Sequence, residues 1–130
     1  MAFLSWHDRF IVGHAEIDAQ HQKLFELVSL FDDVIKMGMS EELGRILDDL
    51  ISATTGHFAF EEALLREIGF PKTLDHARMH AELLKQVQDM RAKMKAGGHV
   101  GAKAIVRFLA DWLTSHLMRE DMDYKPYLHR

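Results

Sequence analysis

The 130-residue chain is long enough for one compact domain, and its 48% hydrophobic residues can fill a core beneath a surface supplied by the 28% charged residues. The net charge of −4 argues against nucleic-acid binding, which needs a basic face. Because the chain has no cysteine, disulfides, thiolate metal sites and iron–sulfur clusters are excluded. No run approaches the roughly 18 apolar residues of a spanning helix, and the first dozen residues lack the apolar region of a signal peptide. We therefore expect no membrane insertion and a cytoplasmic location.

Apolar residues recur every three or four positions through most of the chain, which is the spacing of amphipathic helices. Residues 1–17 lack this period, so we expect an extended N-terminal arm. The predicted helices cover residues of about 19–37, 41–67, 72–96 and 100–118. Asp18 is the expected N-cap of the first helix, and Pro126 is expected to prevent further helix near the C-terminus. Short turns between amphipathic helices predict an all-α fold: residues 1–130 as a single up-down-up-down antiparallel four-helix bundle.

Six polar residues fall at core-facing positions, where a buried polar group without a partner costs roughly 1–3 kcal/mol. They are His21, His57, Glu61, His76, His80 and His116. In an antiparallel hairpin, residues equally distant from the turn lie at equal height. His21 and His57 are centred on residue 39, within Gly38-Met39-Ser40. Glu61 and His76 are centred beside Gly69, and His80 and His116 on Gly98. All four helices thus contribute to one polar layer, which predicts a metal site.

Asp121 follows His116 by five residues, about 500° along a regular helix, which turns it roughly 140° away from that histidine. Spacing alone therefore favours a solvated Asp121, unless the helix ends, tightens or bulges in between. Five imidazoles exceed what one metal usually takes, the lack of thiolates disfavours structural zinc, and calcium and magnesium prefer oxygen. Two iron ions fit best. If they shared Glu61, Asp121 and one solvent-derived oxygen, eleven of twelve octahedral positions would be filled and one would stay open.

Five segments of the chain resemble the hemerythrin family, in particular its single-domain bacterial members. The matching segments are IDAQHQKL at 17–24, HFAFEE at 57–62, HARMH at 76–80, WLTSH at 112–116 and DMDY at 121–124. This resemblance implies that His76, His80 and His116 bind one iron. It implies that His21 and His57 bind the other iron, which keeps the open position. Glu61, Asp121 and an oxo or hydroxo group would bridge the two, which reverses the interpretation of Asp121 from spacing alone.

The resemblance implies a non-heme diiron protein that reversibly binds dioxygen at the open iron, as a carrier, a store or a supplier of oxygen-consuming enzymes. It places four residues around a dioxygen pocket: Leu24, Trp112, Leu113 and Leu117. Plain core packing is the alternative for these four, and it is equally open for Phe25 and Phe58. We expect no enzymatic activity and a monomer. The alternatives are a diiron oxidase, a peroxide or nitric oxide reductase, an iron- or oxygen-sensing module, and a metal-free bundle.

Overall fold

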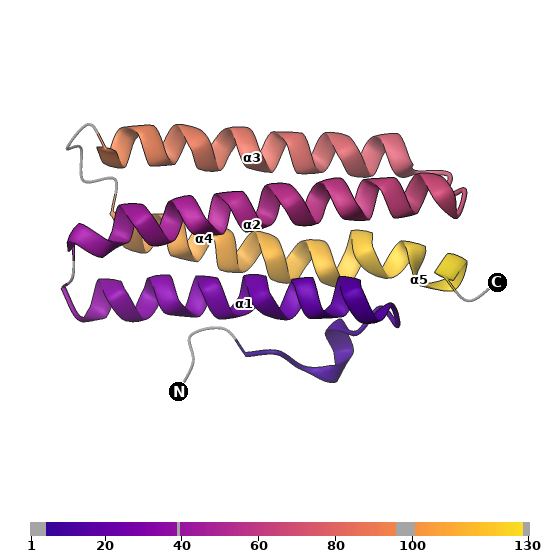
Figure 1. The fold of residues 1–130 in the computed structure, drawn as a ribbon, viewed down its shortest axis with the longest axis horizontal. Helices are drawn as coiled ribbons and strands as arrows, with labels where there is room; N and C mark the ends of the chain where they lie inside the picture. Colours follow the sequence, from indigo (N-terminus) through magenta and orange to yellow (C-terminus); the bar gives the residue numbers. More distant parts are fainter. Residues whose placement is uncertain (1–4, 39, 96–100, 129–130) are drawn as a thin grey trace.

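The computed structural model describes residues 5–38, 40–95 and 101–128 (Figure 1). The long helices are α1 (Ala15–Lys36), α2 (Ser40–Glu67), α3 (Thr73–Lys95) and α4 (Ala102–His116). Each helix runs opposite to the one before it, and α1 and α3 both pack against α2 and α4. The described ranges contain no strand. The predicted all-α, up-down-up-down four-helix bundle is confirmed. None of the described helices is both long and apolar enough to cross a membrane.

The first helix begins four residues earlier than predicted, and Asp18 is not its N-cap. His14 holds that position, and its Nδ1 accepts a hydrogen bond from a backbone N–H of the first turn at 3.3 Å. The carboxylate of Asp18 instead accepts from the backbone N–H groups of Val12 at 2.8 Å and Gly13 at 3.1 Å. Asp18 therefore fastens the N-terminal arm to the helix, a use of the carboxylate that helix-capping preferences do not predict.

The N-terminal arm is not extended throughout, as the sequence had led us to expect. A 3₁₀ turn, Asp8–Phe10, folds it back onto α1. Phe10 and Val12 are buried, and the ring of Phe10 meets those of Trp6 and Phe25 with centroids 5.5 and 5.1 Å away. Burying these apolar groups holds the arm on the bundle although the arm lacks a sustained helical period.

Two of the three predicted turns lie within the described residues, and each has a glycine with left-handed backbone. Gly38 follows α1 with φ of 70°, and Gly69 follows α2 with φ of 71°. Only glycine adopts this conformation without steric cost, which explains why both helices stop there. The third predicted turn, Gly97-Gly98, lies outside the described residues.

The chain continues as helix beyond α4, contrary to the expectation based on Pro126. A π-helical turn, Leu117–Asp121, leads into α5 (Met122–Leu128), and Pro126 lies inside α5. Proline removes one backbone donor, but tertiary packing outweighs this local loss. Tyr124, which is fully buried, anchors α5 against Ile17 and Leu65 from α1 and α2.

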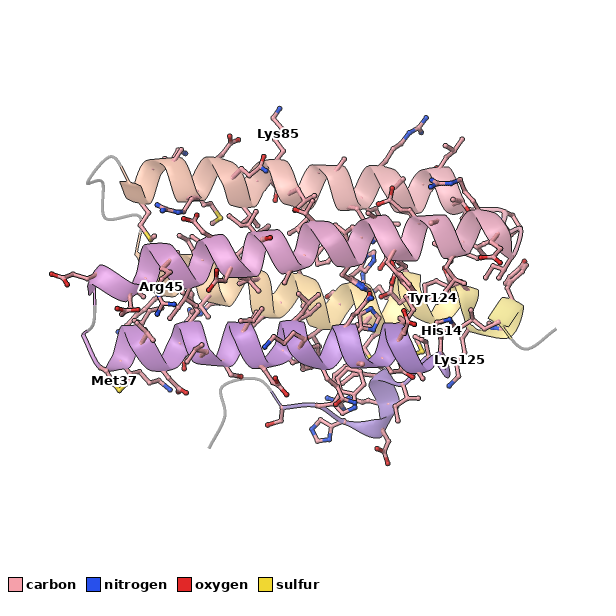
Figure 2. All side chains as sticks on the ribbon, in the orientation of Figure 1. His14, Met37, Arg45, Lys85, Tyr124 and Lys125 are labelled. Carbon is pink, nitrogen blue, oxygen red and sulfur yellow. The ribbon has the colours of Figure 1, made fainter. Side chains whose placement is uncertain are left out.

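The core has two apolar parts on either side of the buried polar residues. The larger cluster fills the bundle toward the turn between α1 and α2, and includes Phe31, Leu47 and Ile105. The smaller cluster lies at the other end and includes Tyr124. Figure 2 shows Tyr124 at the end of the bundle opposite Met37, which follows α1. The polar layer is thus enclosed by apolar side chains along the bundle axis.

Candidate metal centre

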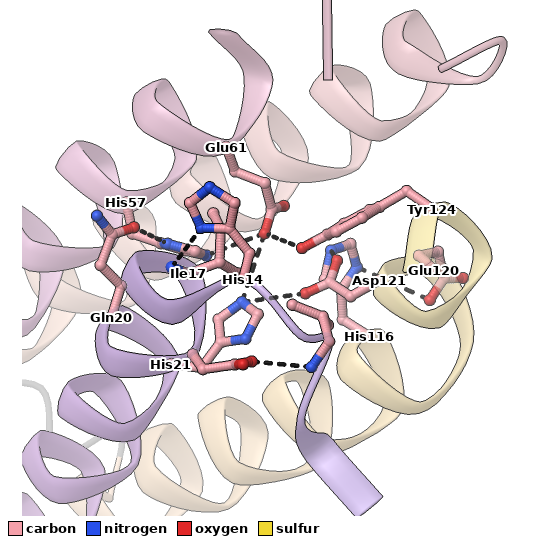
Figure 3. A network of polar contacts seen from close by, with 12 residues as sticks. His14, Ile17, Gln20, His21, His57, Glu61, His116, Glu120, Asp121 and Tyr124 are labelled. Carbon is pink, nitrogen blue, oxygen red and sulfur yellow. Dashed lines mark hydrogen bonds and ion pairs between the residues drawn. The ribbon is translucent and has the colours of Figure 1, made fainter. Parts of the chain in front are cut away.

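Seven polar side chains from all four long helices and the π turn converge in one buried layer. Figure 3 shows five of them, His21, His57, Glu61, His116 and Asp121. Each of the seven is at most 5% exposed. They are His21 from α1, His57 and Glu61 from α2, His76 and His80 from α3, His116 from α4 and Asp121 from the π turn. The residue pattern predicts six of them as metal ligands, and the family resemblance adds Asp121; the fold brings all seven together.

Glu61 lies between two groups of histidines and turns one carboxylate oxygen to each. Its Oε1 is 2.7 Å from Nε2 of His76 and 3.2 Å from Nε2 of His80. Its Oε2 is 3.4 Å from Nε2 of His21 and 3.3 Å from Nε2 of His57. One carboxylate therefore reaches both groups, as a bridging ligand must.

Asp121 divides its oxygens in the same way. Its Oδ1 is 2.9 Å from Nε2 of both His76 and His116, and its Oδ2 is 3.2 Å from Nε2 of His21. We call His76, His80 and His116 the trio, and His21 and His57 the pair. Both carboxylates thus present one oxygen to the trio and the other to the pair.

Local helix geometry explains how Asp121 reaches the layer. A regular helix would turn it away from His116, but the π turn accommodates an extra residue through i→i+5 hydrogen bonding. Residues five apart then lie on the same face, and Asp121 is only 1% exposed. The solvated position favoured by spacing alone is wrong, and the bulge named as its alternative is what the helix contains.

The carboxylates govern the charge of two buried imidazoles, those of His21 and His76. Burial alone would lower the pKa of His21, but its contacts with Asp121 and Glu61 outweigh burial and raise this pKa to about 9. The same balance raises the pKa of His76 to about 10. For His57, burial prevails over the attraction of Glu61, and its pKa is lowered.

Both carboxylates stay ionised in spite of their burial. Burial alone would raise the pKa of Glu61, but close contacts with histidines of both groups hold it well below its usual range. Burial and the charge of Glu61 would also raise the pKa of Asp121, yet contacts with His116 and His21 keep it below its usual value. The layer therefore holds two negative charges, which a cation can neutralise once it displaces the protons of His21 and His76.

Several donor atoms in the layer lack hydrogen bonds, as expected for metal ligands. Nε2 of His21, Nε2 of His80 and Oδ1 of Asp121 are buried and find no hydrogen-bond partner among the described residues. Unsatisfied buried polar atoms are rare in stable proteins. Two sets of mutually close donors emerge: Glu61 with the trio, and Glu61 with the pair. Imidazole and carboxylate donors suit iron, so the residues present fit two iron ions.

Outer partners orient the imidazole rings. Nδ1 of His57 lies 2.6 Å from Oε1 of Gln20, and Nδ1 of His80 lies 2.9 Å from Oε2 of Glu62. Because Oε1 of Gln20 and Oε2 of Glu62 are acceptors, each Nδ1 donates its proton outward, and each Nε2 is left to bind a metal ion. The sequence alone does not predict these roles. The signal was the adjacency of Gln20 to His21 and of Glu62 to Glu61, which says nothing about contacts with other helices.

Tyr124 reaches the layer from α5 and donates its hydroxyl to Oε2 of Glu61 at 2.9 Å (Figure 3). It is 0% exposed, and burial raises its pKa, so it remains a neutral donor. Tyr124 follows Asp121 closely in the sequence, but this position alone does not predict its partner. Its contact depends on a helix that continues past the π turn, contrary to the expectation based on Pro126.

A small apolar cavity of about 20 Å³ adjoins the pair. Its lining combines ligands from the layer with apolar side chains of all four long helices: His21, Leu24, Val28, Leu50, Thr54, His57, Phe58, Leu83, Leu109, Trp112, Leu113, His116 and Asp121. A space of this size accommodates a water-sized molecule. The cavity therefore gives a small apolar guest a place directly beside His21 and His57.

The four residues assigned to the dioxygen pocket by resemblance differ in position. Leu24, Trp112 and Leu113 line the cavity, whereas Leu117 is buried in the larger apolar cluster and is not part of the lining. Of the two phenylalanines left open, Phe58 lines the cavity and stacks on His80 with centroids 3.6 Å apart. Phe25 packs against the N-terminal arm instead.

Comparisons with known proteins agree with this architecture. The family model described as the hemerythrin HHE cation binding domain matches residues 12–128. The chain is 31% identical over 124 residues to a bacteriohemerythrin of Stenotrophomonas maltophilia, covering 95% of this chain and 80% of that protein. It is 30% identical over 129 residues to a bacteriohemerythrin of Methylococcus capsulatus, covering 98% of both. A crystal structure of wild-type hemerythrin superimposes with a TM-score of 0.92 at 28% identity, covering 99% of this chain and 100% of that one.

Proposed function

This chain belongs to the hemerythrin family, and we propose that it is a diiron protein that binds dioxygen reversibly at the layer between the trio and the pair. In this proposal the trio holds one iron and the pair holds the other. Glu61, Asp121 and an oxo or hydroxo group bridge them. The shared function of the family supports dioxygen binding, and the arrangement of donors supports the division into two metal positions.

The observation that carries the proposal is the division of both carboxylates between the two groups of histidines. Oε1 of Glu61 and Oδ1 of Asp121 face the trio, while Oε2 and Oδ2 face the pair. A single metal would have no need of two carboxylates that point both ways. The pair also supplies one nitrogen fewer than the trio, which leaves a free coordination position on its side.

The surrounding side chains prepare that position for a small apolar guest. The cavity beside the pair is lined by Leu24 and Leu113, and these groups exclude water from the site. Trp112 also lines the cavity, and its ring stacks on that of His116 with centroids 4.3 Å apart. Ferrous iron supplies the electrons that dioxygen takes up and returns. The apolar wall keeps the bound guest from exchanging with solvent.

The test is optical and reversible. Protein loaded with ferrous iron is exposed to air and then deoxygenated, while its visible spectrum and iron content are followed. We expect two irons per chain, a visible charge-transfer band in air, and loss of that band with iron still ferrous. Conversion to a ferric form that no longer responds to dioxygen would contradict carriage. Rapid consumption of dioxygen in the presence of a reductant would instead establish an oxidase.

A second arm of the test addresses the cavity. Leu113→Phe adds volume at the lining without removing any metal ligand, so we expect unchanged iron content and weaker or slower dioxygen binding. Leu84→Phe is the matched control, because Leu84 lies in the same helical bundle, is only partly buried and does not line the cavity. Equal dioxygen binding in the two variants would show that the guest does not enter through this cavity.

A further inference from the structure

We infer that hydrogen bonds behind the ligands make the trio a stronger electron donor than the pair, so that the metal held by the trio is the first to lose an electron. The inference rests on the proposed function, since it assumes two metal ions in the layer. It assigns a role to Glu62, Gln20 and Tyr124, none of which is itself a ligand. Three separate contacts carry it, and all three act in the same direction.

The first contact strengthens the trio. Nδ1 of His80 donates to Oε2 of Glu62 at 2.9 Å, and the side chain of Glu62 is 22% exposed. An imidazole whose outer N–H is bonded to a carboxylate gains negative character and becomes a more basic ligand. His116 has a second acidic neighbour, since its Nδ1 lies 3.8 Å from Oε2 of Glu120. Negative charge therefore gathers behind the trio.

The second contact places an uncharged group behind the pair. Nδ1 of His57 donates to the amide oxygen of Gln20 at 2.6 Å, and an amide carries no net charge. Nδ1 of His21 is buried and has no hydrogen-bond partner in the part of the chain that the structure describes. The imidazoles of the pair thus receive no carboxylate support from behind, and they remain weaker donors than those of the trio.

The third contact acts on the shared ligand. Tyr124 donates to Oε2 of Glu61, the oxygen that faces the pair, and leaves Oε1 to the trio. A hydrogen bond to one carboxylate oxygen draws electron density toward the proton and weakens that oxygen as a ligand. Because Tyr124 and Glu61 are both fully buried, this polarisation is not screened by water.

The consequence is a built-in order of oxidation. Electron-rich ligands stabilise the more highly charged state of a metal, so the trio favours ferric iron and the pair favours ferrous iron. The free coordination position lies on the side of the pair. The arrangement therefore keeps the metal beside the cavity in the reduced state, which is the state that a dioxygen-binding position requires.

The test uses three single variants, one of which should act on the trio metal and two on the pair metal. Glu62→Gln removes the carboxylate behind His80 and should raise the reduction potential of the trio metal. Gln20→Glu adds a carboxylate behind His57 and should lower the potential of the pair metal. Tyr124→Phe frees Oε2 of Glu61 and should also lower the potential of the pair metal. All three substitutions should reduce the difference between the reduction potentials of the trio metal and the pair metal.

The measurement is a spectroelectrochemical titration of the iron-loaded protein, with Mössbauer spectra of the one-electron-oxidised form to identify the ferric position. We expect each variant to change the relevant redox equilibrium about tenfold, in line with the effects of outer-shell partners on metal sites, which is about 59 mV for one electron. Glu67→Gln is the matched control, because it removes a carboxylate from the exposed surface of the same helix. It should leave both potentials unchanged.

Two results would overturn the inference: a ferric ion in the pair position of the one-electron-oxidised protein, or potentials that do not move in variants that retain two irons. A merely structural role for these side chains would lower the melting temperature without shifting the potentials in opposite directions. If the unmodified protein failed to hold two irons or to show the dioxygen-dependent band, the proposed function itself would fail, and this result is distinct from both.

Discussion

Asp121 shows how one side chain depends on the helix that carries it. It is 1% exposed and touches both the trio and the pair, although its position in the acidic run Glu120-Asp121-Met122-Asp123 suggests a solvated residue. Its neighbour Asp123 has a side chain that is 55% exposed and lies 3.9 Å from Nζ of Lys72. Two aspartates only two residues apart thus have opposite environments, which makes them a matched pair for substitution.

We expect Asp121→Asn to lower iron affinity at least about tenfold, because it removes one of the two negative charges that the layer offers to cations. Glu61 would remain as the only buried carboxylate of the layer. Asp123→Asn is the control and should bind iron as the unmodified protein does. The measurement is iron content after dialysis against a chelator of graded concentration. Equal retention of iron by the two variants would exclude Asp121 as a ligand.

The titration of His21 and His76 predicts how the metal-free protein responds to alkali. Folding raises their pKa from the ordinary 6.5 to about 9 and about 10. Their contribution to stability is therefore fully present below pH 6.5 and is lost as the pH rises through 9 to 10. Conversely, the lowered pKa values of Glu61 and Asp121 add stability above their ordinary range, and this is lost in acid.

The check is the melting temperature of chelator-treated protein between pH 5 and pH 10, which should fall across the upper half of this range. Iron-loaded protein is the comparison, since ligating histidines are neutral and their protons are already released. Its melting temperature should not follow the same alkaline decline. A metal-free protein that becomes more stable between pH 7 and pH 10 would contradict the ion pairs of the layer.

At the scale of the helices, a glycine within α2 and a glycine just after it require different backbone conformations. Gly69 has φ of 71°, where a side chain is strained whatever the space around it. Gly56 lies within α2, is exposed, and has no atom within 4 Å of a Cβ added there. Replacement of glycine by alanine should therefore have opposite effects on the free energy of unfolding at Gly56 and at Gly69.

We expect Gly69→Ala to destabilise the folded protein by about 1 kcal/mol or more, because alanine resists left-handed backbone. Gly56→Ala should stabilise it by about 0.5–1 kcal/mol, because alanine restricts the unfolded chain and favours helix. Urea unfolding of metal-free protein measures both free energies against the same reference. Each variant controls for the other, and a loss of stability at both positions would refute the assignment of Gly56 to a regular, open helical site.

The helices could be predicted because their apolar period is long and regular. The bounds of α2 and α3 lie within one residue of the prediction, and the layer followed from equal distances to the glycine turns. The region after His116 could not be predicted in the same way. A π turn has no apolar period of its own. Pro126 disfavours helix α5 locally, but the burial of Tyr124 stabilises it.

Partners of the ligands were also beyond the sequence. Gln20 and Glu62 each reach a histidine on another helix, and such contacts depend on the rotation of one helix against the next. Periodicity fixes which face of a helix is buried, but not which side chain at the edge of that face meets which neighbour. Asp18 was misassigned for a related reason, since its actual partners lie in the N-terminal arm.

In the molecule as a whole, the metal layer is set between two apolar clusters that need no metal to form. Phe31, Leu47 and Ile105 are completely buried on one side, and Tyr124 with Leu65 on the other. Each such side chain contributes roughly 1.5–3 kcal/mol when removed from water. The bundle therefore has a source of stability that is independent of its polar layer, and this separates it from small domains that fold only around a metal.

We accordingly expect removal of iron to lower the melting temperature without unfolding the bundle. The buried donors of His21, His80 and Asp121 would lose their metal partner, and any ligand that binds only the folded state stabilises it by mass action. Circular dichroism should show the same helical content before and after chelation at 25 °C, together with an earlier thermal transition. Re-addition of ferrous iron should restore the transition. Loss of helical signal on chelation would mean that the two clusters cannot hold the four helices together unless the layer between them is bound to metal.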